Sequence, residues 1–226
     1  ISPVLNKFSL TSLSPVVGGI IAVSLTLLIA QILHQRGTLI LVLAGIVISG
    51  FMQALVGLLK YIADPDSQLQ SIVYWQLGSL AKVDFSNIIA VLPFLLVGTI
   101  ILFVLRWHMT ILSLGNQQAR LEGINVDMEQ LLIITASTFL TAATVCLSGN
   151  IGWIGLVIPH IARLLVGDNT KETLPLAAVI GALFLLIVDT MARSLSAGEI
   201  PLSILTGFIG APLFVYILIK KKVQLN

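Results

Sequence analysis

The chain has 226 residues, of which 57% are hydrophobic and only 10% charged, with a formal net charge of +2 and a mean hydropathy of +1.06. A soluble domain carries about 25% charged residues, so the composition excludes an ordinary soluble protein, and the small net charge gives no indication of nucleic-acid binding. The single cysteine, Cys146, excludes an intrachain disulfide. We predict an all-α, polytopic membrane protein, because helices satisfy their own backbone hydrogen bonds in hydrocarbon.

Seven apolar segments approach the length of a membrane span, which takes roughly 20 residues. The uncharged run from Gln130 to Pro159 is too long for one span, and we divide it at Ser148-Gly149-Asn150 because these residues favour turns. The second piece is short, which predicts a half-length or tilted helix. The predicted spans are Pro15–Leu33, Gly37–Leu59, Asn87–Leu105, Gln130–Leu147, Ile151–Val166, Leu174–Ala192 and Ile200–Ile219.

Two of the connecting segments carry more than a turn. Residues 67–82 form an amphipathic stretch with Tyr74 and Trp75, which predicts an external helix lying at the membrane interface. The polar segment from Ser113 to Glu129 contains a one-to-two-turn helix between Gly115 and Gly123. That helix is either a plain interhelical loop or a coupling helix that fits a groove on a cytoplasmic partner.

The Lys and Arg residues predict the orientation, since they are enriched in cytoplasmic loops. With seven alternating spans, the C-terminus and the Ser113–Glu129 segment fall on the basic, cytoplasmic side. One side then holds Arg36, Arg106, Arg120, Arg163, Lys171, Lys220, Lys221 and Lys222, whereas the other holds Lys60, Lys82 and Arg193. An even number of spans would mix the two sets.

Three charged residues gather near the external end of the sixth predicted span. Asp189 and Arg193 are four residues apart, so they share a helix face and can pair. The pair is either a structural ion pair or an external docking charge, and both can hold. Glu199 follows in Gly198-Glu199-Ile200-Pro201 and is either a helix-start carboxylate or part of the same docking surface.

Other motifs favour structural roles. His160 and Arg163 lie one turn apart at a cytoplasmic helix end, and His160 is interpreted as hydrogen-bonded structure rather than a metal ligand, because no second His or Cys lies at ligand spacing. Gly210-Ala211-Pro212 predicts a kink or a locally unwound backbone. The sequence contains neither a P-loop nor an H-E-x-x-H motif, so we expect neither ATP binding nor protease chemistry in this chain.

An ordered series of motifs resembles the FecCD family, the membrane subunits of binding-protein-dependent ABC importers for iron–siderophores, haem and vitamin B12. The matching motifs are Tyr74–Leu80, Leu112–Gly115 with Ala119-Arg120, Gly152–Arg163, Leu174-Pro175, Asp189 with Arg193, Glu199–Pro201 and Ile209–Phe214. Family members have ten spans and form the pore from two copies. The resemblance, together with a start at Ile-Ser-Pro rather than Met, implies that residues 1–226 are one permease domain lacking its first three spans.

The resemblance also implies roles for particular residues. Residues 112–125, hereafter the coupling segment, would sit in the ATPase subunit, and Arg193 with Glu199 would contact the substrate-binding protein. Gly37 and Thr38 would belong to the inner gate region. The coupling residues are Leu114, Gly115, Ala119, Arg120, Leu121 and Gly123, and the structural motif residues are Gly155, Pro159, His160, Arg163, Asp189, Pro201, Gly210 and Pro212.

The expected function is that of a permease subunit in a bacterial cytoplasmic membrane. The resemblance makes iron–siderophore the leading cargo, with haem, cobalamin and oxyanions as alternatives. The expected partners are an ABC ATPase, a substrate-binding protein, a second copy of the permease and membrane lipid, but no nucleic acid. We expect no cofactor and no catalytic residue in this chain, with ATP and Mg bound by the ATPase. The alternatives are a secondary carrier or channel without an ATPase, which requires ionisable groups at mid-span, and a membrane-embedded enzyme, which requires clustered catalytic groups.

Overall fold

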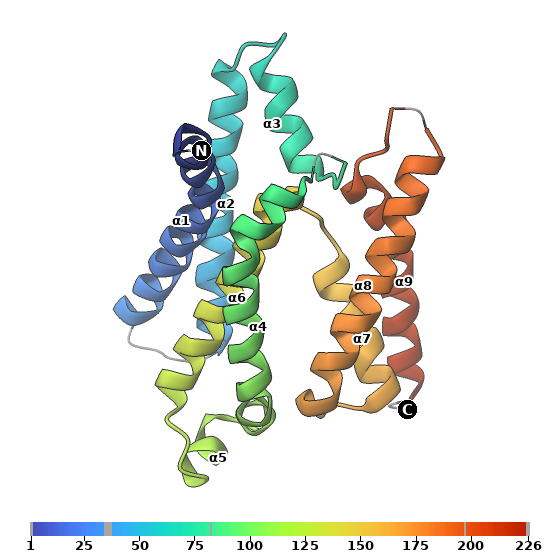
Figure 1. Ribbon diagram of the computed structural model, residues 1–226. Helices are drawn as coiled ribbons and strands as arrows, with labels where there is room; N and C mark the ends of the chain where they lie inside the picture. The colour runs from blue at the N-terminus through green and yellow to red at the C-terminus, as the bar shows by residue number, and fades with distance from the viewer. Residues whose placement is uncertain (1, 34–37, 82, 197, 225–226) are drawn as a thin grey trace.

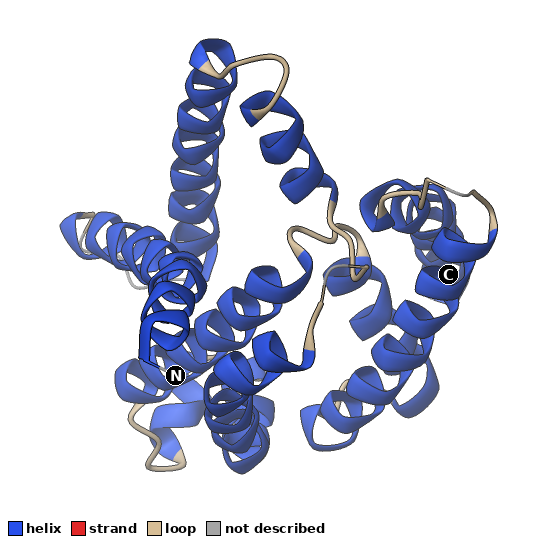
Figure 2. Ribbon diagram, turned by 45° about the horizontal axis from the view of Figure 1, so that its top comes forward, coloured by secondary structure: helices blue, strands red, loops and turns tan. Residues whose placement is uncertain are grey.

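The computed structural model describes residues 2–33, 38–81, 83–196 and 198–224, and all regular structure in this part of the chain is helical (Figures 1 and 2). Gly37 lies outside the described residues, and so does the side chain of Thr38. The helices are α1 (Ser2–Ile32), α2 (Thr38–Ile62), α3 (Gln68–Leu77), α4 (Phe85–Ser113), α5 (Asn116–Leu121), α6 (Val126–Ser148), α7 (Ile154–Val166), α8 (Thr170–Ser194) and α9 (Leu202–Gln224).

The helices have the dimensions of a multi-pass membrane protein. Five of them are long and apolar enough to cross a membrane, and two shorter apolar helices cover Val16–Ile32 and Ile154–Val166. Large apolar side chains such as Val104 and Phe208 are more than two-thirds exposed, as expected where hydrocarbon rather than water covers the surface. The predicted all-α membrane fold is confirmed, and each predicted span corresponds to one apolar helix.

The helices form two groups. α1, α2, α4 and α6 pack together, α7, α8 and α9 form the other group, and α4 contacts α8 between them (Figure 1). The backbones of α4 and α6 approach closely at Gly98, where an added Cβ would lie 2.7 Å from Leu140 Cγ and 3.0 Å from the Ala136 carbonyl oxygen. Small residues permit this kind of contact between membrane helices, so α4 and α6 form the rigid centre of the first group.

Local chemistry explains how α6 tolerates its polar residues. The Asn125 side chain caps its first turn by accepting from the Met128 backbone N–H at 3.3 Å. The hydroxyl groups of its threonines donate to carbonyl oxygens one turn earlier, which satisfies them without water. These bonds are Thr135 to Leu131, Thr138 to Ile134, Thr141 to Ser137 and Thr144 to Leu140, at 2.7–3.0 Å.

Two sequence-based expectations about the helices need correction. The predicted break after Leu147 is confirmed, but α7 begins at Ile154 rather than Ile151, because residues 149–153 form an irregular connection. Of the kink or local unwinding expected at Gly210–Pro212, the unwinding is absent, since α9 remains helical through Pro212. The 13-residue α7 is about 20 Å long at 1.5 Å per residue, shorter than the roughly 30 Å hydrocarbon core, so the prediction of a short helix is confirmed.

Candidate functional site

Helix α5 projects at one end of the molecule, the α5 end, on the connection between α4 and α6 (Figure 1). It has only six residues, too few for a helix to be stable by itself. Gly115 precedes it with a φ of +117° and Gly123 follows it with a φ of +79°. Glycine adopts these angles without steric penalty, so the predicted short helix between two glycines is present and the glycines set its direction.

Three contacts fix α5 to the helices beside it. Ala119 is fully buried in a cluster with Ile111, Ile124 and Val126, and its carbonyl oxygen accepts from the Ile124 N–H at 3.0 Å. The Arg120 guanidinium lies 3.8 Å from the Asp127 carboxylate, with both side chains largely exposed. The Asn116 side chain accepts from Gln130 at 3.4 Å.

The coupling segment exposes two large apolar side chains among polar ones. Leu114, which caps the end of α4, is 70% exposed, and Leu121, the last residue of α5, is 78% exposed. A short helix with one exposed leucine before it and another at its end is suited to insertion into a groove of another protein. Buried Ala119 anchors the segment, whereas Leu114 and Leu121 are the large apolar residues available to a partner.

The opposite end of the molecule, the α3 end, holds the predicted charge pair. Arg193 Nε donates to Asp189 Oδ2 at 2.9 Å, so the predicted pairing on one face of α8 is confirmed. Arg193 remains about half exposed, and the exposed Glu199 follows on the α8–α9 connection with a φ of +49°. An exposed guanidinium with one of its edges free of Asp189 can still meet an incoming carboxylate.

Three segments meet at the α3 end in a junction defined by residues 75–79, 148–153 and 202–203. The Asn150 N–H donates to the Trp75 carbonyl oxygen at 3.2 Å, Ser79 N–H to Ser148 at 2.8 Å, and Leu202 N–H to Gly78 at 2.9 Å. The Ser203 hydroxyl donates to the Asn150 carbonyl oxygen at 2.7 Å. Both Gly78 and Gly149 have positive φ, and an added Cβ on either would collide with backbone of the facing segment.

The glycine-rich motif that leads into α7 is explained by packing. Trp153 adopts a φ of +69° at the start of α7 and lies against α9, where an added Cβ on Gly210 would be 2.8 Å from Trp153 Cβ. Gly155 is exposed, with open space beside it. Pro159 follows it by four residues and removes the N–H that would bond the Gly155 carbonyl. Pro201 stands directly before α9, and Pro212 is on its exposed side.

His160 has a structural environment, as its sequence context predicts. Its Nδ1 lies 2.7 Å from the Leu156 carbonyl oxygen, and its ring meets Phe214 edge-on with centroids 5.4 Å apart. Arg163 is exposed one turn later. In the described part of the chain, no three His, Cys, Asp or Glu side chains form a group that could hold a metal ion.

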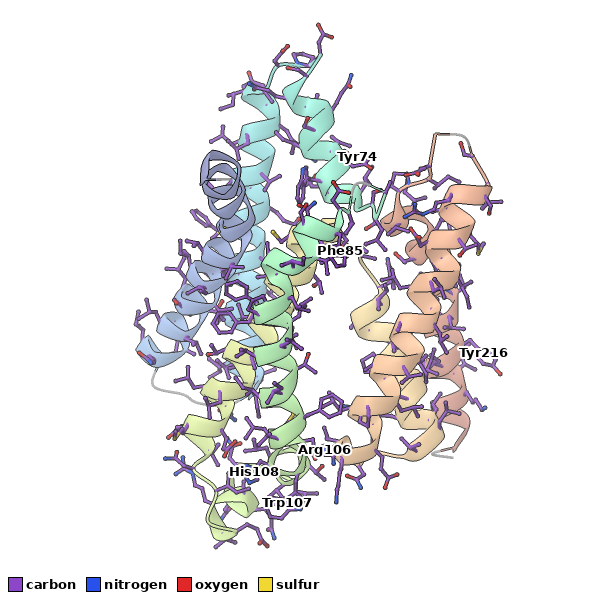
Figure 3. All side chains as sticks on the ribbon, in the orientation of Figure 1. Tyr74, Phe85, Arg106, Trp107, His108 and Tyr216 are labelled. Carbon is purple, nitrogen blue, oxygen red and sulfur yellow. The ribbon has the colours of Figure 1, made fainter. Side chains whose placement is uncertain are left out.

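A polar pocket of about 350 Å³ opens beneath α3, between that helix and the end of α6. Its walls include the hydroxyl-bearing residues Ser67, Ser71, Tyr74 and Ser79, together with Trp75. The pocket and the junction give the α3 end a concave, hydrogen-bonding surface. Figure 3 places Tyr74 on this side of the junction and Phe85 at the start of α4.

Sequence reasoning missed two features of this arrangement. The close approach of Gly78 to Gly149 joins residues far apart in the chain, and no local pattern indicates it. The contact between His108 on α4 and Glu129 on α6 was also missed. Its only signal was the placement of two ionisable residues on either side of the coupling segment, next to apolar helices.

Comparisons with known proteins agree with these features. The model of the FecCD transport family matches residues 2–220. The molybdate import system permease protein MolB of Haemophilus influenzae is 43% identical over 95% of this chain and 64% of its own length. The hemin transport system permease protein HmuU of Yersinia pestis is 37% identical over 81% of this chain and 55% of its own length.

A solved structure has the same fold. It is an inward-facing conformation of a transporter assigned to the metal-chelate ABC type, and it is 40% identical with a TM-score of 0.86. The match covers 92% of this chain and 67% of the solved one. The chain thus spans about two-thirds or less of the length of these relatives, and over that length it belongs to the FecCD transport family.

Proposed function

We propose that the chain is part of the membrane permease subunit of an ABC importer, driven by a separate ATPase subunit that binds the coupling segment. The main support is a pair of exposed leucines on either side of the buried anchor Ala119, with Leu114 just before α5 and Leu121 at its end. The α5 end would face the cytoplasm, consistent with the Lys and Arg distribution. ATP and Mg would be bound by the ATPase, and the permease would supply contacts that differ between two states of the pore.

The α3 end would face outward and receive a substrate-binding protein. Exposed Arg193 and Glu199 would contact that protein, and the polar pocket beneath α3 would border the entrance. A second copy of the permease would complete the pore, with lipid around both. The location would be a bacterial cytoplasmic membrane, and Gly37 and Thr38 would lie at the inner gate.

The cargo is proposed to be an iron–siderophore or a related metal chelate. The solved relative is assigned to the metal-chelate type, whereas the printed names of two relatives specify molybdate and hemin. The pocket beneath α3 offers hydroxyl groups together with the Trp75 ring, a combination that can contact both the polar and the apolar parts of a chelate.

The test is co-purification of an ATPase with the tagged full-length permease from detergent-solubilised membranes. Leu121→Glu should remove the ATPase, because it places a charge on the exposed apolar contact without disturbing a buried residue. Leu195→Glu, an equally drastic change at an exposed leucine of the α3 end, is the matched control and should retain it. Absence of a P-loop ATPase from every sample would contradict the proposal and favour a carrier or channel that works alone.

A further inference from the structure

One contact between two ionisable side chains at the α5 end involves no residue of α5 itself. His108 Nδ1 lies 2.9 Å from Glu129 Oε1, and their side chains are 34% and 16% exposed. Burying a carboxylate is unfavourable unless it is paired, and apolar residues of similar size often stabilise a protein as well as a buried ion pair does. A contact of this kind is therefore better explained by the position that it enforces than by the stability that it adds.

The two residues flank the coupling segment on separate helices. His108 is on α4, shortly before the segment begins, and Glu129 is in the first turn of α6, just after the segment ends. The chain between them, residues 109–128, includes all of α5 and both of its glycine turns. Figure 3 shows His108 beside Trp107 at the end of α4 nearest to α5. The contact thus joins α4 and α6, the two helices from which the coupling segment projects.

The contact is close but incompletely satisfied. Its atoms approach to 2.9 Å without hydrogen-bond alignment, and both His108 Nδ1 and Glu129 Oε2 are buried with no hydrogen-bond partner among the described residues. Glu129 lies in the first turn of α6, a position where acidic residues are common because helix N-termini attract negative charge. Buried polar atoms without a hydrogen-bond partner are uncommon in proteins, so this pair calls for a role beyond local packing.

The nearby pair of Arg120 and Asp127 differs from this contact in its exposure and in the helices that it joins. Arg120 and Asp127 are 3.8 Å apart with side chains 63% and 44% exposed, and exposed pairs of this kind contribute little. Arg120 belongs to α5 itself, whereas neither His108 nor Glu129 does. The less exposed pair, His108 and Glu129, therefore links α4 to α6, whereas the exposed pair links α5 to α6.

We propose that His108 and Glu129 are positioning residues that hold α4 and α6 in register beneath the coupling segment, so that a push on α5 moves both helices together. This inference rests on the proposed function, because it supposes an ATPase seated on the segment. It assigns the pair to transmission of the movement rather than to contact with the ATPase. Removing the pair should therefore reduce coupling while leaving assembly intact.

The experiment uses the full-length permease reconstituted in proteoliposomes with its ATPase and binding protein. It measures ATP hydrolysis with and without the binding protein, the Kd for the ATPase, and the unfolding midpoint. Glu129→Gln and His108→Gln should each lower the stimulation by the binding protein about 2- to 30-fold, the range expected for loss of a coupling contact. The Kd for the ATPase should stay within about twofold, and the double variant should be no worse than either single one.

Two further variants make the result decisive. Glu172→Gln removes an exposed carboxylate from the first turn of α8 and should leave the stimulation unchanged, which controls for helix-end charge. The exchange His108→Glu with Glu129→His restores the pair in reverse and should recover part of the stimulation that the single variants lose, although it moves the carboxylate away from the first turn of α6. Full stimulation in Glu129→Gln or additive losses in the double variant would each overturn the inference. Failure of the unmodified permease to bind an ATPase would instead contradict the proposed function.

Discussion

At the scale of single residues, glycine positions decide which segments can touch. Gly78 ends α3 with a φ of +67°, and an added Cβ would lie 2.5 Å from the Asn150 carbonyl oxygen. Gly45, in α2, has nothing within 4 Å of the same added atom. The same residue type is therefore required at a contact between distant segments and merely tolerated on a helix surface.

Gly78→Ala should destabilise the protein by at least about 1–3 kcal/mol, the range for a residue forced into a left-handed backbone conformation. The collision with Asn150 adds to that figure. The measurement is the thermal unfolding midpoint in detergent, with Gly45→Ala as the control. Gly45→Ala should be neutral or stabilising by roughly 0.5–1 kcal/mol, since alanine is the better helix former. Equal midpoints for the two variants would show that the junction does not require a glycine.

Arg193 is the residue on which the proposed docking surface can be tested. Arg193→Glu should weaken binding of the substrate-binding protein, because it replaces an exposed positive charge with a negative one at the α3 end. The loss should be larger at low salt, where surface charges are less screened. Affinity is measured by titrating the binding protein onto reconstituted permease at two ionic strengths. Lys171→Glu, at the other end of α8, is the control, and equal affinities for both variants would exclude the docking role.

At the scale of elements, α5 depends on its surroundings. A helix of six residues is not stable alone, and its buried contact is Ala119 against Ile111, Ile124 and Val126. The glycines at its two ends set the direction of the chain but provide no packing. The position of the coupling segment therefore follows from one small side chain that fits between α4 and α6.

Ala119→Leu should displace α5, because a larger side chain has no room at a fully buried position. Overpacking of this kind costs about 1–3 kcal/mol when the structure must adjust, and here the least constrained element is α5. The expected result is loss of the co-purified ATPase with little change in expression. Gln118→Leu adds a similar side chain at the exposed neighbouring position and should retain the ATPase. Retention in both variants would mean that the segment tolerates movement.

At the scale of the whole molecule, the short helix α7 determines on which side of the membrane the chain enters α8. It packs with α8 and α9 rather than with the α4–α6 group, and its 13 residues return the chain to the α5 end. Five long helices and two short apolar ones thus place α5 and the α7–α8 turn at the same end of the molecule.

Site-directed labelling tests this topology. In a Cys146→Ser background, cysteines at Gln118 and Glu172 should react with an impermeant maleimide only in inside-out vesicles, and a cysteine at Asp66 only in right-side-out vesicles. All three positions are exposed, and the background without cysteine should remain unlabelled. Labelling of position 172 from the same side as position 66 would mean that α7 does not return the chain across the membrane.

The sequence by itself determined the class of the protein and the order of its helices. Hydropathy is a property of each segment, so the spans and the break after Leu147 could be found without tertiary information. The Asp189–Arg193 pair could also be found, because helical periodicity places residues four apart on one face. The short helix α5 was predicted from its two flanking glycines, whereas its coupling role stays a prediction from the motif series that resembles the family.

Tertiary structure decided the contacts between segments that are distant in the chain. The start of α7 at Ile154 depends on Trp153 packing against Gly210, and the junction depends on Gly78 meeting residues 149–150. Tertiary structure also decided that α9 continues through Pro212. These features, like the His108–Glu129 contact, arise from how helices approach one another, and hydropathy cannot encode that because lipid and a neighbouring helix are equally apolar environments.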